Sequence, residues 1–189
     1  MFPNPDLRFS PGSPFAGGNL PKTNPLIDYE MGGPDLGQTG GQLTSTLWQL
    51  RVEENDFNLY KEDSFISTVY TLPGVEEASL AFDQNMRPVL FYRLNRRLFL
   101  RWFNAVSNTY QIDLFGYGHS PCCSLDDKRS FALSYSSVIV AYIQNQQLLY
   151  RVQSERYENV HVAASGLNPN TKLSAIGMTQ DFRFQFQLD

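Results

Sequence analysis

The sequence is poor in charged residues, in cysteine and histidine, and in long hydrophobic runs. Charged residues make up 18% of the 189 positions, whereas an average soluble domain has about 25%. No run approaches 18 apolar residues, so the sequence predicts no membrane span. The formal net charge of −4 argues against a nucleic acid or an anionic membrane as the partner.

The two cysteines and two histidines are too few to build a disulfide framework or a zinc site. Cys122 and Cys123 are adjacent, so they do not predict a disulfide, and a reducing compartment is the default. Zinc needs about four ligands with regular spacing. The run from His119 to Cys123 has only Asp126 and Asp127 beside it, and His161 lies in a predicted strand. We therefore read 119–123 as a loop with partly buried thiols and predict no metal site.

Catalytic signatures are also missing. The acidic pairs sit at predicted turns, and neighbours in a strand would point to opposite faces, which does not suit paired-carboxylate catalysis. These pairs are Glu53-Glu54, Glu76-Glu77 and Asp126-Asp127. Gly116-Tyr117-Gly118 leads to a proline instead of a helix, so it is no phosphate loop. The sequence predicts neither an enzyme nor a cofactor.

Residues 1–42 differ from the rest of the chain. They hold seven of the eleven prolines and eight of the thirteen glycines, and their apolar residues occur singly, without a helical or strand period. Such a segment cannot bury enough of itself to offset the entropy of ordering. We expect an extended arm that lies on a neighbouring chain, the alternative being an arm folded on its own domain. Its predicted anchors are Phe2, Phe9, Phe15, Leu26 and Ile27.

Residues 43–189 show the two-residue period of β-strands and form the predicted β-rich body. Turn signals such as Pro73-Gly74 separate the strands, and no helical stripe exceeds two turns. The predicted strands are 43–52, 57–61, 64–72, 78–82, 88–94, 98–102, 109–115, 131–135, 138–143, 148–153 and 159–164, followed by a hairpin at 172–188. The fold class is all-β.

Two stretches of the body repeat each other. Tyr92, Asn95, Leu98 and Arg101 recur 50 positions later as Tyr142, Asn145, Leu148 and Arg151. The units, at about 76–118 and 119–166, each hold four short strands, which is the size of a β-propeller blade. The body is therefore either a small antiparallel β-sandwich or a set of blade-like repeats. Residues 43–72 would be a degenerate third repeat, and several chains would be needed to close a ring.

Arginines alternate with aromatic residues in the first repeat. This pattern suits binding of single-stranded nucleic acid or a phosphorylated glycan, and equally a hairpin whose arginines pair with acids of a neighbouring chain. The acidic net charge favours the neighbouring chain. The candidate partner surface consists of Arg93, Arg97, Arg101, Trp102 and Tyr117.

Residues 79–88, the short hairpins after them, and the ending at 177–188 resemble small structural proteins of tailed-bacteriophage tails. The resemblance covers roughly residues 76–189 and includes no diagnostic motif. It implies a non-enzymatic virion component of the tail tip, baseplate or fibre attachment. Such a component is made in the host cytoplasm and contacts other tail proteins and copies of itself. The alternative is a carbohydrate- or receptor-binding β module for a host-surface glycan, with Trp48, Trp102, Tyr110 or Tyr117 as stacking platforms.

Overall fold

The computed structural model describes residues 27–34, 45–61, 64–83, 87–125, 137–178 and 183–189. The regular structure in these ranges is antiparallel β-strand, apart from a 3-10 turn at Gln153–Glu155. The predicted all-β class is therefore confirmed.

The strands form three four-stranded sheets, which we call the first, second and third units, and a two-stranded C-terminal hairpin. Within each unit, every strand pairs with the next one along the chain. The first unit is β1 (Ile27–Pro34), β2 (Ser45–Glu53), β3 (Asp56–Lys61) and β4 (Ser64–Thr71). The second is β5 (Val75–Phe82), β6 (Pro88–Leu94), β7 (Arg97–Asn104) and β8 (Thr109–Tyr117). The third is β9 (His119–Leu125), β10 (Val138–Gln144), β11 (Gln147–Val152) and β12 (His161–Ser165), and the hairpin is β13 (Leu173–Met178) and β14 (Phe184–Leu188).

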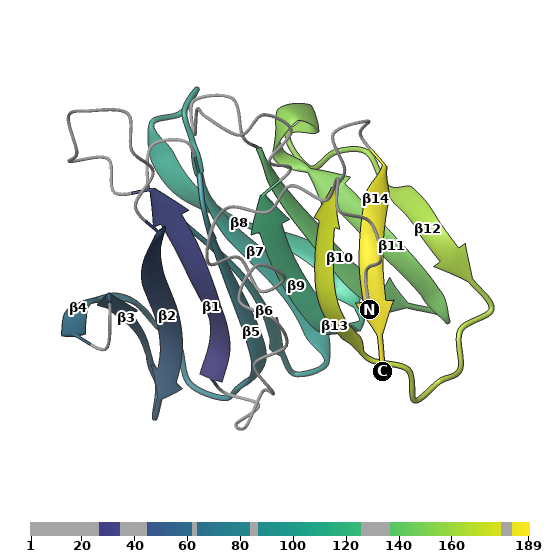
Figure 1. The fold of residues 1–189 in the computed structure, drawn as a ribbon, viewed down its shortest axis with the longest axis horizontal. Helices are drawn as coiled ribbons and strands as arrows, with labels where there is room; N and C mark the ends of the chain where they lie inside the picture. The colour runs from purple at the N-terminus through teal and green to yellow at the C-terminus, as the bar shows by residue number, and fades with distance from the viewer. Residues whose placement is uncertain (1–26, 35–44, 62–63, 84–86, 126–136, 179–182) are drawn as a thin grey trace.

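The sheets follow one another in a row, which Figure 1 shows from the first unit to the C-terminal hairpin. Their first strands lie side by side, because β5 contacts both β1 and β9, and β9 contacts β13. A buried hydrogen bond of 2.8 Å from the Cys123 backbone N–H to Ser79 Oγ joins two of these strands. The arrangement is blade-like, but the described strands do not close a ring.

The recurring asparagines form equivalent tight turns. Asn95 and Asn145 both have φ of 50°, and the residues after them, Arg96 and Gln146, have φ of 63° and 60°. Two successive residues with positive φ make the two-residue hairpin turn that matches the twist of its strands. Asparagine tolerates this left-handed conformation better than most residues, which explains why it recurs at this position.

The recurring tyrosines form the joints between neighbouring sheets. Tyr92 packs against Phe57 and Tyr70 of the first unit, with ring centres 5.7 and 6.2 Å apart. Tyr142 of the third unit contacts Phe91 and Phe115 of the second unit at 5.8 and 5.6 Å. Both tyrosines are almost completely buried. The repeat in the sequence therefore encodes how one sheet packs on the sheet before it.

The recurring arginines complete the same joints. The guanidinium carbon of Arg101 lies 5.0 Å from the ring centre of Tyr70 on the outermost strand of the first unit. Arg151 lies 4.1 Å from the ring centre of Phe115 on the outermost strand of the second unit. Each arginine thus covers an aromatic ring of the preceding unit, a contact that is favourable when partly desolvated.

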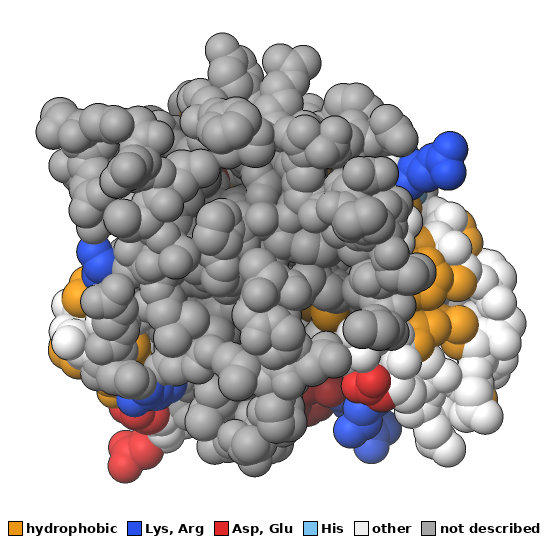
Figure 2. All heavy atoms as spheres, in the orientation of Figure 1, with side chains coloured by type: hydrophobic (Ala, Val, Ile, Leu, Met, Phe, Trp, Pro, Cys, Tyr) orange, Lys and Arg blue, Asp and Glu red, His pale blue; other side chains and the backbone are white. Residues whose placement is uncertain are grey.

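The C-terminal hairpin ends the row. Phe184 stacks on Tyr150 with ring centres 4.2 Å apart, and Phe186 and Leu188 pack on the same hydrophobic cluster. The alternating residues Gln185 and Gln187 point to the opposite face. In Figure 2 the described atoms on the right side, toward β12 in Figure 1, are mostly hydrophobic side chains and white atoms, which are backbone or uncharged side chains, with charged side chains at the margins. A polar outer face is typical of a terminal, capping repeat.

A strand forms in the segment that the sequence analysis assigned to an arm. Residues Ile27–Pro34 form β1 and pair with β2, and Ile27 lies opposite Arg51 of its own chain. The end of the predicted arm therefore pairs with the body of its own chain, which the local pattern does not reveal, while the role of Ile27 as an anchor on a neighbouring chain stays a prediction. Phe2, Phe9, Phe15 and Leu26 lie outside the described residues.

The first strand of the third unit also differs from the prediction. The run 119–123 belongs to β9 and is not a loop, while 131–135 lies outside the described residues. A register irregularity in the pairing with β10 falls beside Ser120, which has φ of 55°, and accommodates Pro121. Cys122 and Cys123 are buried and form no disulfide, and they contribute to two different hydrophobic clusters.

Candidate partner-binding surface

The large apolar side chains that remain exposed gather on the outermost strands. β4, β8 and β12 each end their sheet, and among the described strands each pairs along one edge. An apolar strand at a sheet edge favours association, because it offers both unpaired backbone groups and hydrophobic area. The exposed residues on these strands are Phe65, Ile66, Tyr110, Ile112, Leu114, Tyr117 and Val162.

β8 carries the longest such series. Tyr110, Ile112 and Leu114 alternate along the strand and share one face, with 38%, 46% and 54% of their area exposed. Phe115 is buried on the other face, against Tyr142 of the third unit. The exposed row therefore lies on the face turned away from the third unit.

Two arginines of β7 lie beside the ends of this row. Arg97 is paired with Tyr117 across the strands, and Arg101 with Ile112. The guanidinium carbon of Arg97 is 5.0 Å from the Tyr117 ring centre, and that of Arg101 is 3.9 Å from the Tyr110 ring centre. We call Arg97, Arg101, Tyr110, Ile112, Leu114 and Tyr117 together the β8 surface.

Arg97 and Arg101 can each accept a further ionic or hydrogen-bonding partner. Among the described residues, no carboxylate forms an ion pair with Arg97 or Arg101. Arg97 donates to the Tyr117 hydroxyl at 3.1 Å, and this bond, with the charge of the guanidinium, lowers the pKa of Tyr117. The Nη1 atom of Arg101 is buried, and no described group accepts a hydrogen bond from it. Burial raises the pKa of Tyr110, and the charge of Arg101 partly opposes that shift.

Arg151, the counterpart of Arg101 in the repeat, donates hydrogen bonds to two acceptors. Its Nε donates to the Tyr142 hydroxyl at 3.3 Å, and its Nη1 donates to the Tyr157 carbonyl at 2.9 Å. The carbonyl comes from the turn after β11, where Arg156 and Tyr157 both have positive φ. The short turn between β7 and β8 supplies no equivalent carbonyl acceptor to Arg101. The two repeats therefore share a joint, but of the two equivalent arginines Arg101, and not Arg151, has a buried guanidinium nitrogen without an acceptor among the described residues.

The structure separates the five residues that the sequence analysis grouped into one surface. Arg97, Arg101 and Tyr117 lie together on the β8 surface. Arg93 instead pairs with Glu76 at 2.9 Å and with Glu77 at 3.3 Å inside the second unit. Trp102 is only 5% exposed and packs edge-on against Tyr157, so its placement on an accessible surface is wrong. Alternation along β7 turns Trp102 away from its neighbours Arg101 and Phe103.

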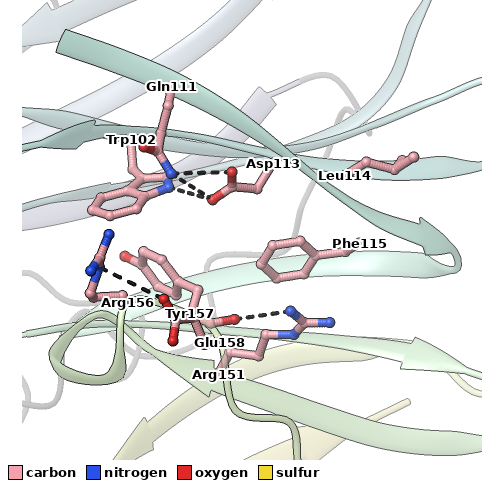
Figure 3. A pocket seen from close by; sticks show the side chains of 9 residues that line it. All are labelled: Trp102, Gln111, Asp113, Leu114, Phe115, Arg151, Arg156, Tyr157 and Glu158. Atoms are coloured by element: carbon pink, nitrogen blue, oxygen red, sulfur yellow. Dashed lines mark hydrogen bonds and ion pairs between the residues drawn. The ribbon is translucent and has the colours of Figure 1, made fainter. Parts of the chain in front are cut away.

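A pocket of about 250 Å³ lies on the opposite side of β8, between the second and third units. Figure 3 shows Trp102, Gln111 and Asp113 on one wall and Arg151, Arg156, Tyr157 and Glu158 on the other. The Trp102 indole donates to Asp113 at 2.6 Å, and Gln111 Nε2 donates to both oxygens of that carboxylate at 3.2 Å. Arg156 and Glu158 form an exposed ion pair at 3.8 Å. Since its polar groups bind one another, the pocket supports a ligand less well than the β8 surface does.

Several other polar and titratable side chains have partners within the described structure. Glu53 accepts hydrogen bonds from Asn58 at 2.7 Å and from the Tyr60 hydroxyl at 3.2 Å. His161 contacts Glu155 at 2.7 Å, and burial lowers the pKa of His119. Within the described ranges, no three His, Cys, Asp or Glu side chains gather as metal ligands would. No helix in these ranges has the length and apolar character to cross a membrane.

Sequence reasoning missed Ile112 and Leu114. Their alternation with Gln111 and Asp113 was readable, but an apolar strand face is ordinarily assigned to a core. Here the edge position of β8 leaves that face uncovered, and edge position follows from sheet order, which the local sequence does not show.

Comparison with known proteins does not assign a family. No family model matches the sequence, and neither a curated protein nor a solved structure matches the chain.

Proposed function

We propose that this chain is a non-enzymatic structural subunit of a multi-chain assembly, attached through the β8 surface. The observation that carries the proposal is the combination of three exposed apolar side chains on an edge strand with two arginines that no described carboxylate neutralises. Large apolar groups at an exposed sheet edge favour association, so a stable protein keeps them covered in its working state.

The kind of assembly comes from the resemblance alone. On that basis we propose a bacteriophage tail, with the chain near the tail tip, the baseplate or the fibre attachment. The open row of described sheets supports a bracing role, because the joint between the first and second units and the joint between the second and third units are built alike.

The test uses purified particles of a phage whose genome encodes this chain. We expect quantitative mass spectrometry to give a constant copy number per particle, and antibody labelling to mark the tail in electron micrographs. If the chain is absent from particles purified by density gradient, the tail assignment is refuted.

A carbohydrate-binding module is the second candidate function, favoured by the exposure of Tyr117 at 61% of its area. Tyr110 is also accessible, whereas Trp102 is buried and does not serve as a platform. The side chain of Trp48 is not among those described. A glycan array with the full chain separates the two candidates: specific binding that a Tyr117→Ala variant abolishes would favour the module over the structural subunit.

A further inference from the structure

We propose that the outer edge of β8, with which no described strand pairs, binds an extended segment of a different protein in which two carboxylates flank a short apolar stretch. This inference rests on the proposed function and deepens it by naming the chemistry of the partner. Three independent features of the β8 surface lead to it: the backbone edge, the apolar row and the spacing of the two arginines.

The backbone edge permits strand addition. β8 spans nine residues and ends the sheet order β5-β6-β7-β8, so only the edge facing β7 is paired within the sheet. Every second residue of an edge strand directs its N–H and C=O groups outward. An added strand pairs with these groups, and side-chain pockets then select its sequence.

The apolar row selects apolar residues at alternate positions of the added strand. Ile112 and Leu114 are exposed by about half of their area and point to the same face. Cross-strand neighbours on one face lie close enough to contact each other. Two β-branched residues on the added strand would cover both side chains.

The two arginines set the position of the acids. Their guanidinium groups lie over Tyr110 and Tyr117, which are seven positions apart on β8. The pairing of β8 with β7 shifts by one residue between Leu114 and Gly116, so these seven positions advance the strand by about six regular residues, or roughly 20 Å, and keep both tyrosines on one face. Carboxylates about six residues apart on the added strand therefore lie within reach of both guanidinium groups and share the face of the apolar pair.

The acidic residues available on the outer strands favour a different protein as the partner over a second copy of this chain paired through those strands. The last strands of the other two units, β4 and β12, contain neither aspartate nor glutamate. Pairing of β8 with itself would supply only Asp113, which is bonded to Trp102 on the opposite face, and would bring arginines of like charge together. A second copy that pairs through β4, β8 or β12 therefore does not supply the carboxylates that Arg97 and Arg101 require.

Fluorescence anisotropy with a designed peptide tests the inference on the full chain. The probe is Glu-Thr-Val-Thr-Val-Thr-Glu, which places both acids and both valines on one face. We expect saturable binding that weakens at least about tenfold in 1 M salt or in an Arg97→Met/Arg101→Met variant, because the opposite charges are screened or removed. The matched control is Arg156→Met, which removes an exposed arginine of the third unit and should bind like the native chain.

Two further peptides make the test specific. A peptide with lysine in place of both glutamates should fail to bind the native chain but should bind an Arg97→Glu/Arg101→Glu variant. A peptide with proline in place of the central threonine should bind weakly, because it loses a backbone donor and distorts the strand. Equal binding of the acidic and basic peptides, or full binding by the arginine variants, would overturn the proposal.

The folding controls and the particle experiment distinguish failure of this inference from failure of the proposed function. Circular dichroism checks that each variant folds, and Arg97→Met alone, at an exposed position, serves if the double variant does not fold. Absence of peptide binding by a chain that is present in purified particles refutes this inference and leaves the proposed function standing. Peptide binding by a chain that is absent from particles supports the strand-addition site and refutes the tail assignment.

Discussion

Truncation of Tyr142 to alanine should destabilise the protein strongly, because this ring is the centre of the joint between the second and third units. The side chain is fully buried and contacts Phe91 at 5.8 Å and Phe115 at 5.6 Å. Removal of a buried aromatic side chain costs about 3–5 kcal/mol, which includes the cavity left behind. Arg151 Nε also loses its acceptor, which lies at 3.3 Å, so we expect the upper part of that range.

Equilibrium unfolding in urea measures this loss. Denaturant slopes of about 1–3 kcal/mol per molar urea convert the expected change into a midpoint lower by at least about 1 M. The equivalent Tyr92→Ala variant should behave alike, since Tyr92 occupies the same place in the preceding joint. Tyr117→Ala is the matched control, and its exposed ring should leave the midpoint almost unchanged. A loss below about 1 kcal/mol for Tyr142→Ala would refute the idea that the repeated tyrosine holds neighbouring sheets together.

Four other changes test separate parts of the structure. Trp102→Phe removes the donor to Asp113 at 2.6 Å and should cost about 1–3 kcal/mol in urea unfolding, whereas a neutral result would argue against that hydrogen bond. Asn145→Ala should lower the melting temperature by several degrees through a left-handed strain of about 1–2 kcal/mol, while Asn145→Gly, which has no such strain, should melt near the native temperature. Gly118→Ala would place a Cβ atom 2.9 Å from the Ile143 carbonyl oxygen, and a stability equal to that of the native chain would contradict this close approach. Burial raises the pKa of Tyr92, so the folded state holds this proton more tightly than the unfolded state. The contribution of Tyr92 to stability should be fully present below pH ~10 and be lost as the pH rises above it, so stability across pH 9–11 should fall less steeply in Tyr92→Phe than in the native chain.

The repeated residues were the most informative part of the sequence. Their fixed offset predicted equivalent units, and the structure gives each repeated residue a defined place: a turn for Asn95 and Asn145, and a joint for Tyr92 and Tyr142. Local alternation and turn signals also identified the strands from β2 to β8 and from β10 onward. These features were predictable because a hairpin depends mainly on neighbours in the sequence.

Features that depend on distant partners were not predictable. β1 is defined by its pairing with β2, although Gly32, Gly33 and Pro34 are poor strand formers. β9 contains Pro121, which reads as a loop unless the irregular pairing with β10 is known. The β8 surface required the sheet order as well, since the same alternation describes a buried face in a central strand and an exposed face at an edge.

Hydrogen exchange of β8 tests the central claim most directly, with the isolated chain compared with the chain inside purified particles. If the β8 surface attaches the chain to its assembly, the backbone amides of Thr109–Tyr117 should exchange much more slowly in the particle. The strands β13 and β14 at the capped end serve as an internal reference, whose exchange should change little. Equal exchange of β8 in the two states would contradict the account.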